Sequence, residues 1–250
     1  ADGNGAYERN VVTTTSLWLN GAEATLVKQS AVTAAGTILL NQERTLVSDD
    51  KMTTTVSKDV DADGIYDLIR VTTTSLQANG DTTVTSEYSD TGGLRERSVE
   101  TTSSNGRSIT GSVDINGDGV NDTVTTRVEA GTGVLTIRKS EYSQSSTLQS
   151  RIEEVRSANG LDLTVRTDAD GNGTFERVSE TSRTLNADGT QTTITLHKGA
   201  DGSVHASTTV VTSDDGFETT TSDDIDGDGT FDRVVTESTS ISSNGVKTET

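Results

Sequence analysis

The sequence predicts an all-β protein, built as a tandem array of four-stranded antiparallel units of about 55 residues with acidic loops at the junctions. An acidic stretch of nine residues recurs as DVDADGIYD, DINGDGVND, DADGNGTFE and DIDGDGTFD, and its copies start 55, 54 and 56 residues apart. Between the copies, segments rich in Thr, Val and Ser alternate with Asn-Gly and Asp-Gly turn signals. No segment carries a sustained helical period. A linear array of this kind would be elongated or solenoid-like, and a β-propeller is the alternative.

The acidic copies set the expected boundaries of the repeats. These are residues 1–58 with a truncated acidic loop, 59–113, 114–167, 168–223, and a partial fifth repeat at 224–250. The opening residues, ADGNGAYE, correspond to positions 2 to 9 of the acidic stretch without its leading acid. This truncation and the absence of a starting Met suggest a segment of a longer chain, with any export signal outside it. The number of repeats in the parent chain stays open.

Three further turn signals divide each repeat into four strands. In the second repeat they are QANGD near Gly80, SDTGGL near Gly92 and SSNGR near Gly106; in the fourth they are NADGT, KGADGS and SDDGF. Asn-Gly and Asp-Gly supply the positive φ of tight hairpins. Segments such as LIRVTTTSL and LDLTVRT favour strands through β-branched content and alternation. Three hairpins would therefore join the strands, and the fourth strand would lead into the acidic loop.

Apolar residues align between repeats at two positions beyond the acidic loop. One set lies nine residues after the last acid of the loop, and the other lies two residues after it. The first set is Leu17, Leu76, Leu185 and Ile241, and the second is Ile69, Val124, Val178 and Val234. We expect these residues to form a thin buried seam. Thr and Ser dominate elsewhere, which predicts a solvated face or ladders of threonine side chains.

Composition narrows the classes of partner. Only 29% of residues are hydrophobic and 3% are aromatic, so each repeat buries too little to be stable alone. Disorder is a rival interpretation at a net charge of -19, but the turn signals recur in register. The negative charge argues against nucleic acid as a partner and favours a divalent cation. The chain has no cysteine, and no apolar run approaches the roughly 18 residues of a membrane span.

The acidic loop has the oxygen spacing of a calcium site. Acids or amides occupy positions 1, 3 and 5, glycine occupies position 6 for a sharp reversal, and an acid occupies position 9. Calcium takes six to eight hard oxygen ligands with flexible geometry, whereas magnesium retains its waters. The expected ligands are the side chains at 1, 3, 5 and 9 and the carbonyl at 7: Asp59, Asp61, Asp63, Ile65 and Asp67; Asp114, Asn116, Asp118, Val120 and Asp122; Asp168, Asp170, Asn172, Thr174 and Glu176; and Asp224, Asp226, Asp228, Thr230 and Asp232.

The loop begins like an EF-hand and ends differently. An EF-hand carries a bidentate Glu at position 12 and is flanked by helices, whereas position 12 here is Arg70, Thr125, Ser179 or Val235 and the flanks are strand-like. The loops at Asp59 and Asp224 carry four acids each and the other two carry three, so the first pair should bind more tightly. The remnant at Asp2, Asn4 and Glu8 lacks its first ligand and should bind weakly or not at all.

Two resemblances bear on function. DINGDGVND resembles the D-x-[DN]-x-[DN]-G-x-x-D calcium loops of integrin-type FG-GAP repeats and of dockerins. The longer pattern of DxDGDGxFDR, LNADGT, ADGS and SDDG is similar to repeats in very large calcium-binding proteins of Gram-negative bacteria, and it covers essentially the whole chain. Those proteins are grouped with haemolysin-like or RTX-type adhesins exported by type I secretion. The nonapeptide G-G-x-G-x-D of true RTX repeats is absent, so their parallel β-roll is not implied.

These resemblances imply a calcium-stabilised structural or adhesive segment of a secreted cell-surface or matrix protein, with self-association into fibres or matrix as one mode of action. FG-GAP likeness keeps open a calcium-bearing propeller that binds a ligand, and a third alternative is the repeat region of a secreted toxin or enzyme. The adhesive ligand, whether a cell-surface group or a glycan, is open. We expect no catalytic role, because His197 and His205 have no counterparts in other repeats and no Ser-His-Asp grouping recurs.

Overall fold

The computed structural model describes residues 8–33, 35–242 and 247–250, and every regular element among them is a β-strand. The chain divides into two compact units, residues 1–124 with 144–146 and residues 125–143 with 147–250. The described part of the chain holds no helix of the length and apolar character that a membrane crossing requires.

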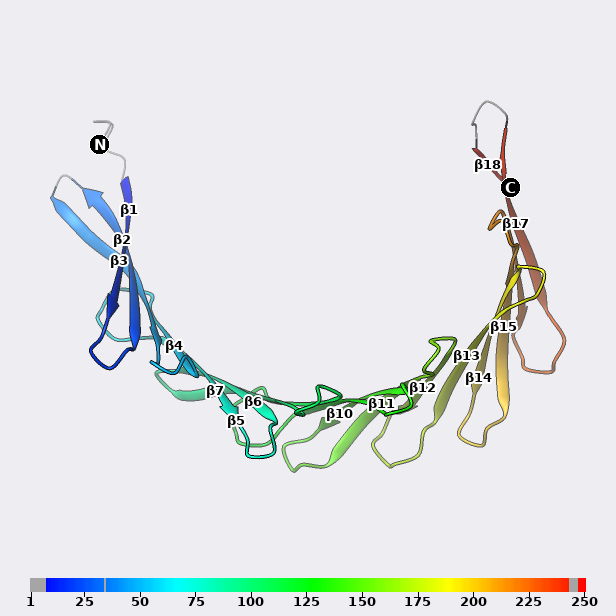
Figure 1. The fold of residues 1–250 in the computed structure, drawn as a ribbon, viewed down its shortest axis with the longest axis horizontal. Helices are drawn as coiled ribbons and strands as arrows, with labels where there is room; N and C mark the ends of the chain where they lie inside the picture. The colour runs from blue at the N-terminus through cyan, green and yellow to red at the C-terminus, as the bar shows by residue number, and fades with distance from the viewer. Residues whose placement is uncertain (1–7, 34, 243–246) are drawn as a thin grey trace. The chain divides into compact units, whose positions relative to one another are not determined.

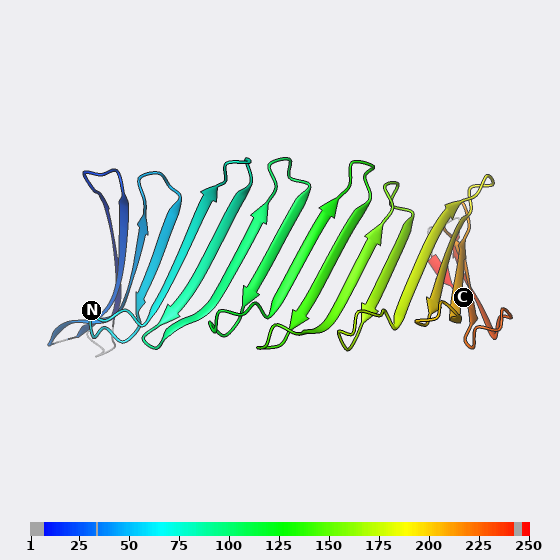
Figure 2. The same cartoon turned by 90° about the horizontal axis from the view of Figure 1, so that it is seen from below.

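The first unit is an antiparallel meander in which each strand pairs with the next one along the chain (Figures 1 and 2). Its strands are β1 (Glu8–Leu17), β2 (Glu23–Thr33), β3 (Gly36–Val47), β4 (Thr53–Asp59), β5 (Leu68–Leu76), β6 (Thr82–Asp90), β7 (Gly93–Thr102) and β8 (Ser108–Asp114). Because direction alternates, the acidic loop between β4 and β5 lies on the same edge of the sheet as the β2–β3 and β6–β7 turns.

The second unit repeats this arrangement. Its strands are β9 (Thr123–Glu129), which begins at the end of the first unit, β10 (Leu135–Tyr142), β11 (Leu148–Arg156), β12 (Asp162–Asp168), β13 (Arg177–Leu185), β14 (Gln191–Lys198), β15 (Val204–Thr212), β16 (Glu218–Asp224), β17 (Arg233–Ile241) and β18 (Lys247–Glu249). From β10 onward each strand pairs antiparallel with its successor.

The all-β, antiparallel, open architecture confirms the predicted fold class. Each of the first four predicted repeats contributes four strands. The strands on either side of an acidic loop also pair, as β4 does with β5, β12 with β13 and β16 with β17. A propeller needs a separate sheet for each blade. Pairing that runs from one repeat into the next within each unit does not fit that alternative.

The predicted buried seam is wrong for its first set of residues. Leu17, Leu76, Leu185 and Ile241 are 75%, 69%, 73% and 55% exposed. In the second set Val234 is also exposed, while Ile69, Val124 and Val178 are half-buried. The reason is that the described strands of each unit contact their neighbours in the chain, and no described element forms a second layer over either face. Among the described residues the buried apolar side chains are Ala22, Ala24 and Ala31.

Cross-strand pairs replace a conventional core. Threonine hydroxyls meet across neighbouring strands in both units, which is one of the two arrangements that the abundance of Thr and Ser predicted. The Oγ1 atoms lie 3.4 Å apart in Thr15–Thr25, 3.0 Å in Thr83–Thr101, 3.1 Å in Thr181–Thr195 and 3.0 Å in Thr220–Thr236. Such pairs contribute roughly 0.2 to 1 kcal/mol each. Among the described residues the sheet therefore depends on hydrogen-bonded ladders and lacks a deep apolar core.

Candidate metal sites

The first aspartate of each acidic loop is buried at the end of a strand. Asp59, Asp114, Asp168 and Asp224 close β4, β8, β12 and β16 and are 0%, 2%, 0% and 3% exposed. Burying a carboxylate is costly unless it is paired, hydrogen-bonded or bound to a cation. In a chain with so few buried apolar residues, the cost of burying these four carboxylates most needs to be offset by hydrogen bonds or by a cation.

One hydrogen-bond pattern recurs in all four loops. The carboxylate at position 1 accepts a hydrogen bond from the glycine N–H at position 6, with donors Gly64, Gly119, Gly173 and Gly229 at 3.1, 2.8, 3.1 and 3.0 Å. The carboxylate at position 9 accepts one from the N–H at position 2, with donors Val60, Ile115, Ala169 and Ile225 at 2.8, 2.8, 2.7 and 2.7 Å. The acid at each end of the loop thus fixes the backbone near the other end.

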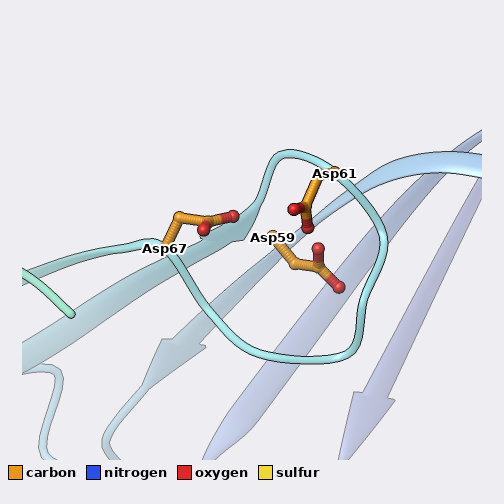
Figure 3. Close-up of side chains that lie close together, drawn as sticks. All are labelled: Asp59, Asp61 and Asp67. Atoms are coloured by element: carbon orange, nitrogen blue, oxygen red, sulfur yellow. The ribbon is translucent and has the colours of Figure 1, made fainter.

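The same geometry brings acids together at positions 1, 3 and 9. Three groups have carboxylate oxygens within 4.8 Å of one another: Asp59, Asp61 and Asp67; Asp168, Asp170 and Glu176; and Asp224, Asp226 and Asp232. Figure 3 shows the first group, with the three side chains turned toward one another on the inner side of the loop. In the remaining loop position 3 is the amide Asn116, and its three acids do not form such a group.

Several inward oxygens have no partner. Asp59 Oδ1, Asp168 Oδ1 and Glu176 Oε1 are buried and accept no hydrogen bond. In the loops at Asp114 and Asp224 the corresponding oxygen accepts from Gly117 N at 2.7 Å and Gly227 N at 2.8 Å. A buried carboxylate oxygen that accepts no hydrogen bond and lies beside two further acids is energetically costly. A bound cation would offset this cost and the repulsion between the three acids.

Hydrogen bonds keep two of these buried acids ionised. Burial raises the pKa of Asp59, but hydrogen bonds from Gln42 and from three loop N–H groups lower it by more, so the pKa lies below its ordinary value. Burial acts in the same way on Asp114, and four loop N–H groups again bring its pKa below the ordinary value. The carboxylate, which is the form that binds a cation, is therefore the stable form of both groups.

The structure does not gather every predicted ligand. The position-5 acids Asp63 and Asp228 stand outside the converging groups of their loops. Asp63, Asp118, Asn172 and Asp228 accept hydrogen bonds from the N–H groups at position 7 instead, at 2.7, 2.8, 2.7 and 2.7 Å. The carbonyls of Ile65, Val120, Thr174 and Thr230 stay predicted ligands. Asp2, Asn4 and the side chain of Glu8 lie outside the described residues.

Sequence reasoning missed the glycine at position 4. Gly117, Gly171 and Gly227 have φ of 73°, 72° and 76°, and a Cβ on them would lie 2.3, 2.1 and 2.4 Å from the carbonyl oxygens of Leu94, Leu148 and Val204. These carbonyls belong to the early residues of β7, β11 and β15, so three loops pack directly on a neighbouring hairpin. The signal was glycine at this position in three of four loops, with Ala62 in the other at φ 65°.

The groups contain only carboxylate oxygen donors, and neither His197 nor His205 takes part in them. Oxygen-only donor sets of this kind suit hard divalent cations. The chain matches no known protein-family model, and no curated protein is significantly similar to it.

Proposed function

We propose that this chain is a calcium-stabilised structural repeat segment in which each acidic loop holds one calcium ion at the connection between successive four-stranded units. The observation that carries the proposal is the buried aspartate at position 1, whose second oxygen in the loops at Asp59 and Asp168 has no partner. A cation at that point would compensate a buried charge and join the two strands that flank the loop.

Calcium fits this donor set better than the other common metals. In three of the four loops three carboxylates converge, and among the described residues no histidine or cysteine joins these groups. Zinc and copper favour imidazole or thiolate ligands, and magnesium demands near-ideal octahedral geometry. Extracellular calcium modules bind at about 10⁻⁴ to 10⁻³ M, which suits a loop exposed at the edge of a sheet.

The wider role that we propose is mechanical and adhesive, in a large secreted cell-surface or matrix protein. A thin sheet with both faces open offers long surfaces for contact, and a charge of -19 suits an environment rich in divalent cations. The described residues contain no grouping typical of a catalytic site. We therefore assign the segment a non-catalytic role, and we assign it the same role if the segment forms part of a secreted toxin or enzyme.

The first test is stoichiometry. Calorimetric titration of chelator-treated chain should show about four calcium ions bound per chain at affinities of about 10⁻⁴ to 10⁻³ M. Equal concentrations of magnesium should give little heat, because magnesium retains its waters. The proposal fails if the chain takes up no calcium at several millimolar, or if magnesium binds equally well.

Loss of one loop should cause local damage. Asp61→Ala or Asp226→Ala removes one of three converging carboxylates and should reduce the bound calcium by one ion. In repeat arrays each unit couples mainly to its neighbours, so hydrogen exchange should accelerate in the strands flanking that loop and stay unchanged elsewhere in the same unit. Asp188→Ala is a matched control, because this carboxylate accepts hydrogen bonds from Thr190 in the β13–β14 turn, at the opposite strand ends from the acidic loops. Protection lost evenly over all strands would contradict nearest-neighbour coupling.

A further inference from the structure

The residue opposite the buried aspartate varies between repeats. In the antiparallel register, Gln42 faces Asp59, Arg97 faces Asp114, Arg151 faces Asp168 and Ser207 faces Asp224. The side chain beside the acidic loop is therefore a neutral amide in one repeat, an arginine in two and a hydroxyl in the fourth. This side chain adds to the differences that the loop sequences already carry.

Arg151 points into its loop. Its Nη2 lies 3.3 Å from Asp168 Oδ2 and 3.5 Å from the carbonyl oxygen of Gly173, and its guanidinium carbon lies 4.6 Å from the centre of the Phe175 ring. The Arg151 side chain is 21% exposed, and the Asp168 side chain is fully buried. One charged group thus contacts positions 1, 6 and 8 of the same loop.

The other arginine points elsewhere. Arg97 pairs with Glu87, with Nε 3.3 Å from Oε1, and its side chain is 47% exposed. In the second repeat the neutral Gln42 donates a hydrogen bond to Asp59 Oδ2 at 2.9 Å. Among these four cross-strand residues, Arg151 is the one whose positive charge contacts the buried aspartate of its loop.

We propose that the positive charge of Arg151 acts as a built-in counter-charge in the loop of the fourth repeat. This charge makes the loop the weakest calcium site of the four, and it keeps the loop ordered without calcium. This inference rests on the proposed calcium binding of the loops. The loop at Asp168 carries three acids, and the guanidinium offsets one of their charges. It also repels an incoming divalent ion. Asp168 Oδ1 and Glu176 Oε1 keep their free lone pairs, so calcium binding is weakened without being abolished.

A charge of one unit at about 5 Å from a divalent ion changes its binding constant by roughly tenfold even with the dielectric constant of water. We therefore expect calcium to fill the loops at Asp59 and Asp224 first, the loop at Asp114 next and the loop at Asp168 last. Acid counts alone would make the last two equal.

Each loop carries its own reporter for this order, because the glycine N–H at position 6 donates to the buried aspartate. Calcium titration of the intact chain labelled with ¹⁵N-glycine should show the Gly173 resonance moving at about tenfold more calcium than Gly119. Arg151→Gln should remove this delay. The reciprocal variant Gln42→Arg should impose a similar delay on Gly64 and does not depend on whether Arg151→Gln folds. Arg97→Gln is the control and should leave Gly119 unchanged.

The outcomes separate the two proposals. If Gly64, Gly119 and Gly229 respond to millimolar calcium and Gly173 responds with them in both the original chain and Arg151→Gln, the role of Arg151 is refuted while calcium binding stands. If no position-6 glycine responds, calcium binding itself is refuted. In chelator, slow amide exchange at Gly173 with fast exchange at the other three glycines would support the metal-free order of this loop. Equally fast exchange at all four would overturn it.

Discussion

Removing calcium with a chelator should lower the melting temperature of this chain and reduce its strand signal in circular dichroism, and restoring calcium should reverse both changes. The four full loops hold fourteen acidic side chains, and four bound calcium ions would change the formal net charge from -19 to about -11. Binding to the folded state alone stabilises it by about 2.7 kcal/mol per site at a free calcium concentration 100 times the dissociation constant. Because the buried apolar side chains among the described residues are three alanines, little else would replace that contribution.

Circular dichroism, calorimetry and small-angle scattering with and without chelator measure this effect. Magnesium at matched ionic strength is the control, because general screening would act on all the carboxylates alike. Strand content, dimensions and melting temperature that are the same in both conditions would mean that calcium, even if bound, does not organise the fold.

The second large effect should follow from Gly171→Ala. Its positive φ disfavours any side chain by about 1 to 2 kcal/mol, and the new Cβ would also overlap the Leu148 carbonyl oxygen, which lies 2.1 Å away. Relieving that overlap requires the acidic loop to move off β11, and we expect a further cost of about 1 to 3 kcal/mol. Calcium affinity at Asp168 should fall as well, because the loop that carries it is displaced.

Gly173→Ala in the same loop is the matched control. Gly173 has φ of 92° with no atom within 4 Å of its Cβ position, so the substitution carries the backbone strain without the overlap. Denaturant unfolding in a fixed calcium concentration compares the two variants. Equal losses of stability would show that the close approach to Leu148 contributes nothing.

Local chemistry was enough to predict the strands and turns. Gly80 and Gly106, chosen from Asn-Gly pairs, have φ of 86° and 70°, as tight hairpins require. The buried seam failed for a different reason. Alignment of Leu76 and Leu185 shows that two positions are equivalent, but only the presence of a second layer makes such a position buried, and layer number is a property of the whole unit.

The acidic site was predictable in part. The spacing predicted side-chain ligands at positions 1, 3, 5 and 9, and the structure brings the acids at 1, 3 and 9 together in three of the four loops. Asp63 at position 5 stands outside its group and accepts a hydrogen bond from the N–H of Ile65. The contact of Arg151 with Asp168 depends on cross-strand register, which is set by the turn at residues 157–161 and is not encoded in either residue.

The meander topology also bears on how the chain folds. Every registered pair of strands consists of consecutive strands, and the widest cross-strand separations are those of Glu8 with Val32 and Glu23 with Val47. Folding rate falls as contacting residues lie further apart in sequence, and here each new strand closes only a short loop onto a strand already formed. The sheet can therefore grow one strand at a time from any nucleus within a unit. Additional repeats add further steps to this process, but they do not slow any single step.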